Sequence, residues 1–406
     1  MRSLILLAAA FCAAGQEQTS LSPEQAVEQA LLSHPLLASA RARIEAAEGL
    51  RLQASLRPNP RLYLQSENAR LGGTATPFRF AQETDNFAYA SQVIEAPGKR
   101  DMRTRLAGEV IRRRQADLEL LRAQIARRVA VAYWSAVGGE HIREILRQNL
   151  ANFEQTVEYH RNLVREGAAA EVDLIRIEVE KDQVAVQYQN AEQEARRLRL
   201  QLFQEMGKPD QPDVVLAGNL YDVRPFITDT IEQAMARRRD LQLGRQVVQQ
   251  ARAAERVEHA NAKPDPEVLF GYKRTAGYNT VIAGFQIPLP FRHRNQGGIA
   301  AAVAETKAAE HELKSAELAA ESEILAAQNE YNQKLRLVTE TVPKIRSQAE
   351  ETVRIARAVY REGASDLLRL LDAERTALQA QLLFVRSLTE YHVALVNLKA
   401  ATGMLP

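Results

Sequence analysis

The chain repeats itself, and this repeat constrains its fold more than any other feature. The stretch LVREGAAAEVDLIRIE begins at Leu163, and VYREGASDLLRLLDAE begins at Val359, a shift of 196 positions. At that offset residues 156–207 lie over residues 352–403 without a gap. Upstream, AVEQALLSHPLLASARARIEAAEGLRLQASLRPNP parallels TIEQAMARRRDLQLGRQVVQQARAAERVEHANAKPDP. Internal similarity of this extent predicts two copies of one structural unit, at residues 16–210 and 211–406.

Each copy is predicted to begin with one helix and to continue with a β-hairpin. The helices are expected at Pro23 to Leu56 and Thr228 to Ala262, ending at PNP or PDP because proline cannot continue a helix. Alternating runs follow, at RLYLQSE and residues 87–93 in the first copy and at EVLFGYK and residues 281–287 in the second. Period-two alternation predicts strands, so hairpins are expected at 61–95 and 267–289, with loops at 68–85 and 274–279.

Long helices are predicted after each hairpin. The helical period holds over Lys99 to Arg165 and Gly298 to Arg361, with minor interruptions at Gly138-Gly139 and Pro343. At 1.5 Å per residue each segment would extend about 100 Å. Their narrow apolar stripe in a charged background is typical of a coiled coil. Gly167 and Gly363 then predict the tips, at 165–168 and 361–364, where each long helix folds back on a partner.

Composition argues against several classes of function. The net charge is +2, so no global field favours nucleic acid or anionic lipid. The seven histidines fall in no metal-ligand spacing and no Gly-rich phosphate loop is present, so we expect neither an enzyme nor a cofactor. His160 lies in the apolar stripe and is interpreted as a packing residue.

The N-terminus reads as an export signal. MRSLILLAAAFCAAGQEQ has one basic residue, an apolar run and then small residues, which predicts a signal peptide over residues 1–15. Cys12, the single cysteine, is either removed with the signal or lipidated as a new N-terminus. No later stretch has eighteen consecutive apolar residues, so contact of the mature chain with a membrane would have to use strands.

Four strands cannot close on themselves. An open sheet leaves two edges of unpaired backbone amides, which hydrocarbon does not tolerate. Closure therefore requires several chains, and three chains would supply twelve strands, an even number within the range of outer-membrane barrels.

The duplicated order, the paired REGA tips, EAPGKR after the second strand and PLPFRHRNQGG after the fourth resemble the TolC-like outer-membrane efflux factors. SQVIEAPGKR looks closest to the heavy-metal and cation branch. The resemblance implies an α+β, mostly α fold. It also implies a homotrimer whose twelve-stranded β-barrel in the outer membrane of a Gram-negative-type cell continues into a periplasmic α-barrel. Such a trimer would dock on a periplasmic adaptor and an inner-membrane pump and act as a passive exit duct for metal cations or small toxic compounds.

Alternatives stay open at this point. The duct could serve type I protein secretion, or the chain could be a periplasmic coiled-coil adaptor, although an adaptor would normally have one hairpin. A purely structural coiled coil would not explain the alternating runs beside the prolines.

The resemblance also suggests where function resides. Adaptor contact would fall on the tips, at Arg165, Glu166, Gly167, Arg361, Glu362 and Gly363, although glycine there is also explained by turn geometry alone.

A periplasmic gate is suggested by Asp372, which matches an acidic position of the family, whereas Arg369 departs from the family pattern. The first copy has Asp173 and Arg176 in reversed charge order, so the four could form a salt-bridged lock, or two ordinary solvated pairs.

Overall fold

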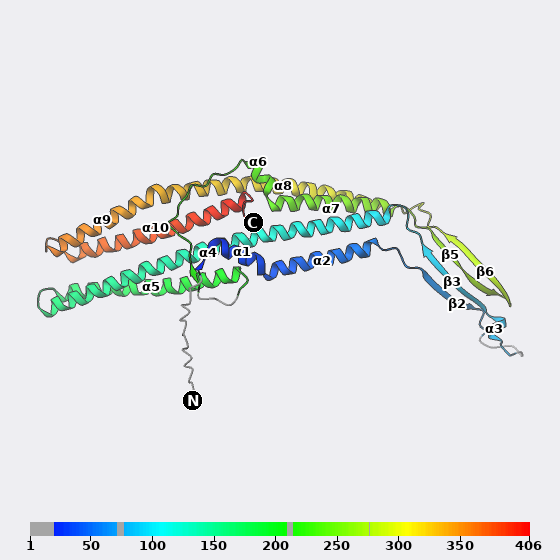
Figure 1. The fold of residues 1–406 in the computed structure, drawn as a ribbon, viewed down its shortest axis with the longest axis horizontal. Helices are drawn as coiled ribbons and strands as arrows, with labels where there is room; N and C mark the ends of the chain where they lie inside the picture. Colours follow the sequence, from blue (N-terminus) through cyan, green and yellow to red (C-terminus); the bar gives the residue numbers. More distant parts are fainter. Residues whose placement is uncertain (1–19, 71–76, 209–213, 276) are drawn as a thin grey trace, which may run out of the picture.

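The computed structural model describes residues 20–70, 77–208, 214–275 and 277–406. The expected signal peptide and Cys12 lie outside these residues. Figure 1 shows an elongated body of long helices, with a sheet at one end and the tips of two helical hairpins at the other. The described residues are mostly helical, as predicted. No helix among them combines the length and the apolar character that a bilayer span requires.

The first helix of each copy is broken, where one continuous helix was predicted. The first copy has α1 (Pro23–Ser33) and α2 (Pro35–Ser55), and the second has α6 (Ile231–Arg237) and α7 (Arg239–Asn261). His34 is extended, with ψ of 127°, because the ring of Pro35 disfavours the helical conformation at the preceding residue. Both copies start with the same capping box, at Ser22 and Thr230.

Two helical hairpins make up most of the body. In the first copy α4 (Lys99–Arg165) packs against α5 (Glu171–Glu205). In the second copy α8 (Gln296–Arg336), a π-helical turn η1 (Leu337–Thr341) and α9 (Val342–Arg361) follow one another, and α10 (Leu367–Ala401) returns. The π turn ends just before Pro343, whose missing N–H and bulky ring disturb the regular helix there.

The long helix predicted at Lys99 to Arg165 is confirmed with these bounds, and the minor interruption expected at Gly138-Gly139 does not break it. The helix runs through both glycines for 67 residues. A Cβ at Gly138 would lie 2.1 Å from the Thr389 Oγ1 of α10, and one at Gly139 would lie 2.8 Å from Leu198 of α5. The glycines therefore let two helices approach α4 closely, and they do not end it.

The main core lies at mid-length, where both copies meet. Tyr133, Leu202, Tyr391 and Leu398 are buried there. Residues that link the copies join the same core: β1 (Ser20–Leu21) pairs in parallel with β4 (Val215–Leu216). The Tyr133 hydroxyl donates to the Leu21 carbonyl oxygen at 2.7 Å. This one core therefore contains residues of both helical hairpins and holds them together near the middle of the body.

The four long strands form one antiparallel sheet in the order β2-β3-β5-β6. Their bounds are β2 (Arg61–Glu67), β3 (Asp85–Val93), β5 (Glu267–Thr275) and β6 (Tyr278–Gln286). The expected loop at 274–279 is shorter in the structure, because β5 and β6 extend into it. The longer loop at 68–85 contains the short helix α3 (Phe80–Glu83). Antiparallel pairing of β3 with β5 makes the two hairpins a single sheet.

Candidate functional site

One face of the sheet is apolar and uncovered. Leu62, Ala90, Phe270 and Ala283 lie in one row across the four strands, and Leu64, Ala88, Tyr272 and Val281 lie in the next. The side chains of Leu64, Phe270 and Val281 are 74%, 67% and 70% exposed. An apolar patch of this kind on a sheet marks a surface that another apolar phase or partner covers.

The opposite face carries polar and aromatic side chains. Tyr63 stacks on Tyr89 with ring centroids 4.9 Å apart, and the Lys273 ammonium lies 4.9 Å from the centroid of Phe87. Gly271 is opposite Tyr89, and a Cβ at 271 would come within 2.3 Å of the Tyr89 Cα. The sheet is therefore amphipathic across its thickness.

Both edges of the sheet are open. Within the described residues β2 and β6 are each paired on one side only. An edge strand presents unpaired N–H and C=O groups, which readily pair with a further strand. The site is thus an amphipathic ribbon with two free edges.

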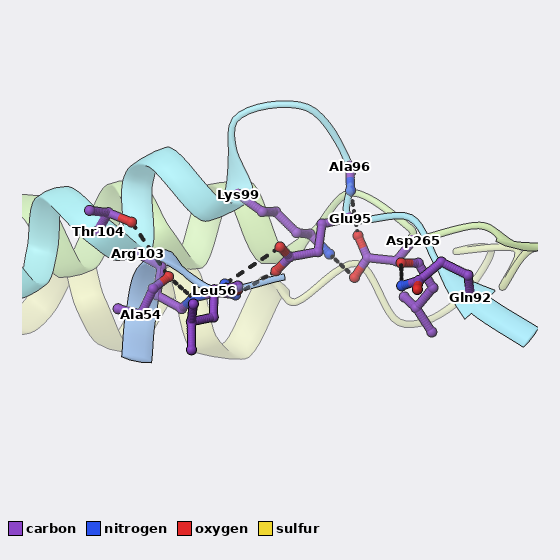
Figure 2. Close-up of polar contacts among 10 residues, drawn as sticks. Ala54, Leu56, Gln92, Glu95, Ala96, Lys99, Arg103, Thr104 and Asp265 are labelled. Atoms are coloured by element: carbon purple, nitrogen blue, oxygen red, sulfur yellow. Dashed lines mark hydrogen bonds and ion pairs between the residues drawn. The ribbon is translucent and has the colours of Figure 1, made fainter. Parts of the chain in front are cut away.

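A polar junction joins the sheet to the helices (Figure 2). The Asp265 carboxylate in PDP accepts from the Ala96 N–H at 2.7 Å and from the Lys99 ammonium at 2.8 Å. Because Ala96 and Lys99 belong to EAPGKR, this contact joins the second copy to the first. Partial burial of the Asp265 carboxyl acts to raise its pKa, but the hydrogen bonds from Lys99 and Ala96 together with nearby positive charge outweigh it, so the pKa lies below its ordinary value.

Arg103 fastens α4 to the end of α2 at the same junction. Its guanidinium donates to the carbonyl oxygens of Ala54 at 2.8 Å and Leu56 at 3.1 Å, and it pairs with Glu95. The final carbonyl groups of a helix have no partners within that helix, so a cation there is favourable. These contacts of Arg103 fix the direction in which the chain leaves α2 towards the sheet.

The two tips lie together at the far end of the body (Figure 1). Gly167 and Gly363 both have φ of 72°, in the left-handed region. At each tip the residue after the glycine donates back into the helix, Ala168 to the Leu163 carbonyl at 2.8 Å and Ala364 to the Val359 carbonyl at 3.0 Å. This backbone pattern is a common way to end a helix.

All six predicted tip residues are exposed in the structure. None of the four charged ones among them takes part in a recorded ion pair in the described part of the chain. Arg165, Glu166, Arg361 and Glu362 therefore present their charges to solvent.

An equivalent ion pair links the two arms of each helical hairpin. Arg161 pairs with Glu178 at 3.0 Å in the first copy, and Arg357 pairs with Glu374 at 2.5 Å in the second. Hydrogen bonding to Glu374 raises the pKa of Arg357. These are equivalent positions, so the duplication preserved a link between the two arms of the hairpin.

The two hairpins are joined to each other by different residues. Arg375 on α10 forms an ion pair with Glu180 on α5. The buried His160 ring on α4 hydrogen-bonds to the Tyr360 hydroxyl on α9 at 2.8 Å, and its other ring nitrogen contacts the Thr156 carbonyl oxygen. His160 is thus a packed and hydrogen-bonded residue.

The four predicted gate residues lie near the tips but do not pair between hairpins. Asp173 and Arg176 form an ion pair within α5 at 3.8 Å. Arg369 donates its backbone N–H to the Asp366 side chain that caps α10, and Asp372 is exposed. Within the described chain no ion pair joins Asp173 or Arg176 to Arg369 or Asp372.

Sequence reasoning did not find the roles of Asp265, Tyr360 or the Glu180–Arg375 pair. A signal existed for Asp265, since PDP and EAPGKR were both recognised as motifs and supply an acid and a lysine. The described residues contain no group of three or more His, Cys, Asp or Glu side chains placed to hold a metal ion.

Comparisons with known proteins agree with this geometry. Residues 230–404 match the family model described as outer membrane efflux protein. The cobalt-zinc-cadmium resistance protein CzcC of Cupriavidus metallidurans is 23% identical over 387 residues, covering 94% of this chain and 90% of that protein.

Solved structures share the fold. The outer-membrane channel OprN has a TM-score of 0.76 at 21% identity, over 94% of this chain and 89% of that one. The open-state outer membrane channel MtrE of Neisseria gonorrhoeae has a TM-score of 0.79 at 17% identity, over 94% and 89%.

Proposed function

We propose that this chain, whose residues 230–404 match the outer membrane efflux protein family, assembles as three copies into a passive exit duct across the outer membrane. The observation that carries this proposal is the amphipathic four-stranded ribbon with two free edges. Its uncovered leucine, valine and aromatic side chains suit lipid, and its polar face suits an aqueous lumen.

Closure of the sheet requires more than one copy. Backbone groups at a free edge must be paired within hydrocarbon, so β6 of one copy needs β2 of another. Three copies give twelve strands in a closed barrel. The helical hairpins then surround a periplasmic tube below it, with most of each chain in the periplasm of a Gram-negative-type cell.

The proposed cargo is divalent metal cations, delivered through a periplasmic adaptor by an inner-membrane pump. This step is supported by the printed name of the relative CzcC, a cobalt-zinc-cadmium resistance protein. The duct would supply a route and the pump would supply the driving force, so no metal-binding site is required of the chain itself.

The adaptor is proposed to contact the tips, at Arg165, Glu166, Gly167, Arg361, Glu362 and Gly363. Their exposure supports this assignment, as does the lack of an ion pair at the four charged residues within the described part of the chain. Asp372, Arg369, Asp173 and Arg176 lie just inside the tips and are proposed to line the closed periplasmic mouth.

The test is complementation of metal tolerance. The chain is expressed in a Gram-negative strain that keeps its cobalt-zinc-cadmium pump and adaptor but lacks the outer-membrane component. Restored growth on zinc, cobalt or cadmium is expected, together with recovery of the chain in outer-membrane fractions. A double variant, Leu64→Asp with Val281→Asp, places charge on the apolar face and should abolish both. Recovery of the unsubstituted chain in the soluble periplasmic fraction would contradict the proposal.

A further inference from the structure

The junction between the two copies within this chain is a complete template for a second junction. Asp265 accepts from the Ala96 N–H and from Lys99, and the Ile94 N–H donates to the Pro266 carbonyl oxygen at 2.8 Å. Val93, the last residue of β3, is opposite Glu267, the first residue of β5. The PDP turn of one copy thus seats on the turn that follows the second strand of the other.

Two further turns of the chain have the sequence features of such a junction, one before β2 and one after β6. Within one chain these two turns do not meet. The PNP turn precedes β2, with Asn59 in the place of Asp265. The turn PLPFR follows β6, and its Pro290 comes four residues after the strand end, as Pro97 does after β3. Leu289 therefore corresponds to Ala96 and Arg292 to Lys99. These two turns lie at the two opposite edges of the sheet.

The turn after β6 is exposed, unlike the corresponding turn after β3. Ala96 is 7% exposed, whereas Leu289 is 63% and the neighbouring Phe291 is 77% exposed. A shallow hollow lined by Pro288, Leu289, Phe291 and Arg292 lies against the end of α7. No hydrogen bond is recorded for the Asn59 side chain or for the Leu289 N–H in the described chain.

We propose that the Pro58-Asn59-Pro60 turn of a second copy of this chain docks on the Pro288–Arg292 turn. The Asn59 side-chain oxygen accepts there from the Leu289 N–H and from the Arg292 guanidinium. The register that follows places Arg61 of the second copy opposite Gln286. The occupant is a second copy because it alone is shown to carry a turn equivalent to the one already seated in the template. The contact rests on the proposed assembly of several chains.

The contact at Asp265 also predicts that the junction within the chain and the junction between copies differ in strength. Within the chain the contact joins an ionised carboxylate to an ammonium, whereas between copies it joins a neutral amide to a guanidinium. Both bonds have an ionised donor, but only the carboxylate adds an attraction between opposite charges. At this contact the link between copies is therefore the weaker one, and Asn59→Asp should strengthen it.

Cysteine crosslinking tests the contact. Asn59→Cys and Leu289→Cys are combined in a Cys12→Ser background, so that the introduced thiols are the only two in the chain. A disulfide requires Cα atoms about 4.4–6.8 Å apart. Within one chain the two edges are separated by three strand spacings, about 14 Å. We expect disulfide-linked dimers and trimers on non-reducing gels, and none for the control pair Glu67→Cys with Leu289→Cys, because Glu67 lies at the other end of β2.

A second measurement does not depend on new thiols. Asn59→Asp should raise, and Asn59→Leu should lower, the temperature at which the oligomer dissociates on heating in detergent. Oligomers that form in the outer membrane without the 59–289 disulfide, and with equal dissociation temperatures for both variants, would overturn this contact and leave the exit duct intact. A chain that never forms an oligomer under amine crosslinking would remove the exit duct as well.

Discussion

At the residue scale, two positions that correspond in the repeat have diverged in charge. Asp265 in the second copy has the Lys99 ammonium and the Ala96 N–H as partners. Asn59 in the first copy has no side-chain partner among the residues that the structure describes. The junction within the chain thus has an aspartate where the junction proposed between chains has an asparagine.

The Asp265 contact predicts a pH dependence. Its pKa in the folded chain lies below the ordinary value of 3.8, so the contact stabilises the fold at pH above about 4. That contribution is lost as the pH falls through the lowered pKa, when the carboxylate becomes protonated. We expect the difference in melting temperature between the parent and Asp265→Asn to be constant above about pH 5 and to shrink below about pH 4. A difference that stays the same down to pH 2 would contradict this assignment.

At the scale of elements, α4 owes its packing to two glycines. α10 and α5 both approach it at Gly138-Gly139, where side chains would collide. The same helix contains Gly108, and a Cβ there would meet nothing within 4 Å. Glycine is therefore required at one point of α4 and is only tolerated at another.

This contrast predicts opposite effects of one substitution. Gly138→Ala should destabilise the protein by about 1–3 kcal/mol, because the added methyl group overpacks the contact with Thr389. Gly108→Ala should stabilise it by about 0.4–1 kcal/mol through the entropy of the unfolded chain. Thermal unfolding followed by circular dichroism measures both, and Thr389→Ala should restore part of the loss at Gly138. Equal effects of the two alanines would show that the close approach is not limiting.

Local patterns predicted those elements whose causes are local. The alternation of RLYLQSE gave the bounds of β2 as the structure has them, and Gly167 and Gly363 announced turns that need positive φ. Pro35 was a visible signal for the break at His34 that the interpretation passed over.

The break at Arg238 had no such signal. The Arg238 side chain is buried, and it is held by Asp240 and by Glu323, which is 85 residues away. The Glu180–Arg375 pair has the same character, since its partners are 195 residues apart. Contacts of this kind follow from the packed structure and not from any short stretch of sequence.

At the scale of the whole molecule, the links between hairpins differ from those within them. The ion pair within a hairpin occurs in both copies, as Arg161–Glu178 and Arg357–Glu374. The links between the hairpins, Glu180–Arg375 and His160–Tyr360, each occur once. The repeated pairs link the two arms of each hairpin, and the single links, together with the shared core around Tyr133 and Tyr391, hold the two hairpins to each other.

The proposed gate can be tested by conductance. Asp372→Arg puts a second cation on the helix face of Arg369, three residues away, and like charges there repel. Repeated in each copy, this should loosen the closed mouth and raise the ion current of the oligomer in a planar bilayer. Asp117→Arg, on the part of α4 remote from the tips, serves as the control and should leave the current unchanged. An unaltered current for Asp372→Arg would remove these residues from the gate.

The uninterrupted course of α4 has a mechanical consequence. A rod of about 100 Å converts a tilt of about 3° at its base into a displacement of about 5 Å at its other end. Arg103 and Lys99 hold that base beside the sheet, so a change of angle there would be amplified along α4. A small tilt at the sheet end would therefore move the tips without any bend in the helix.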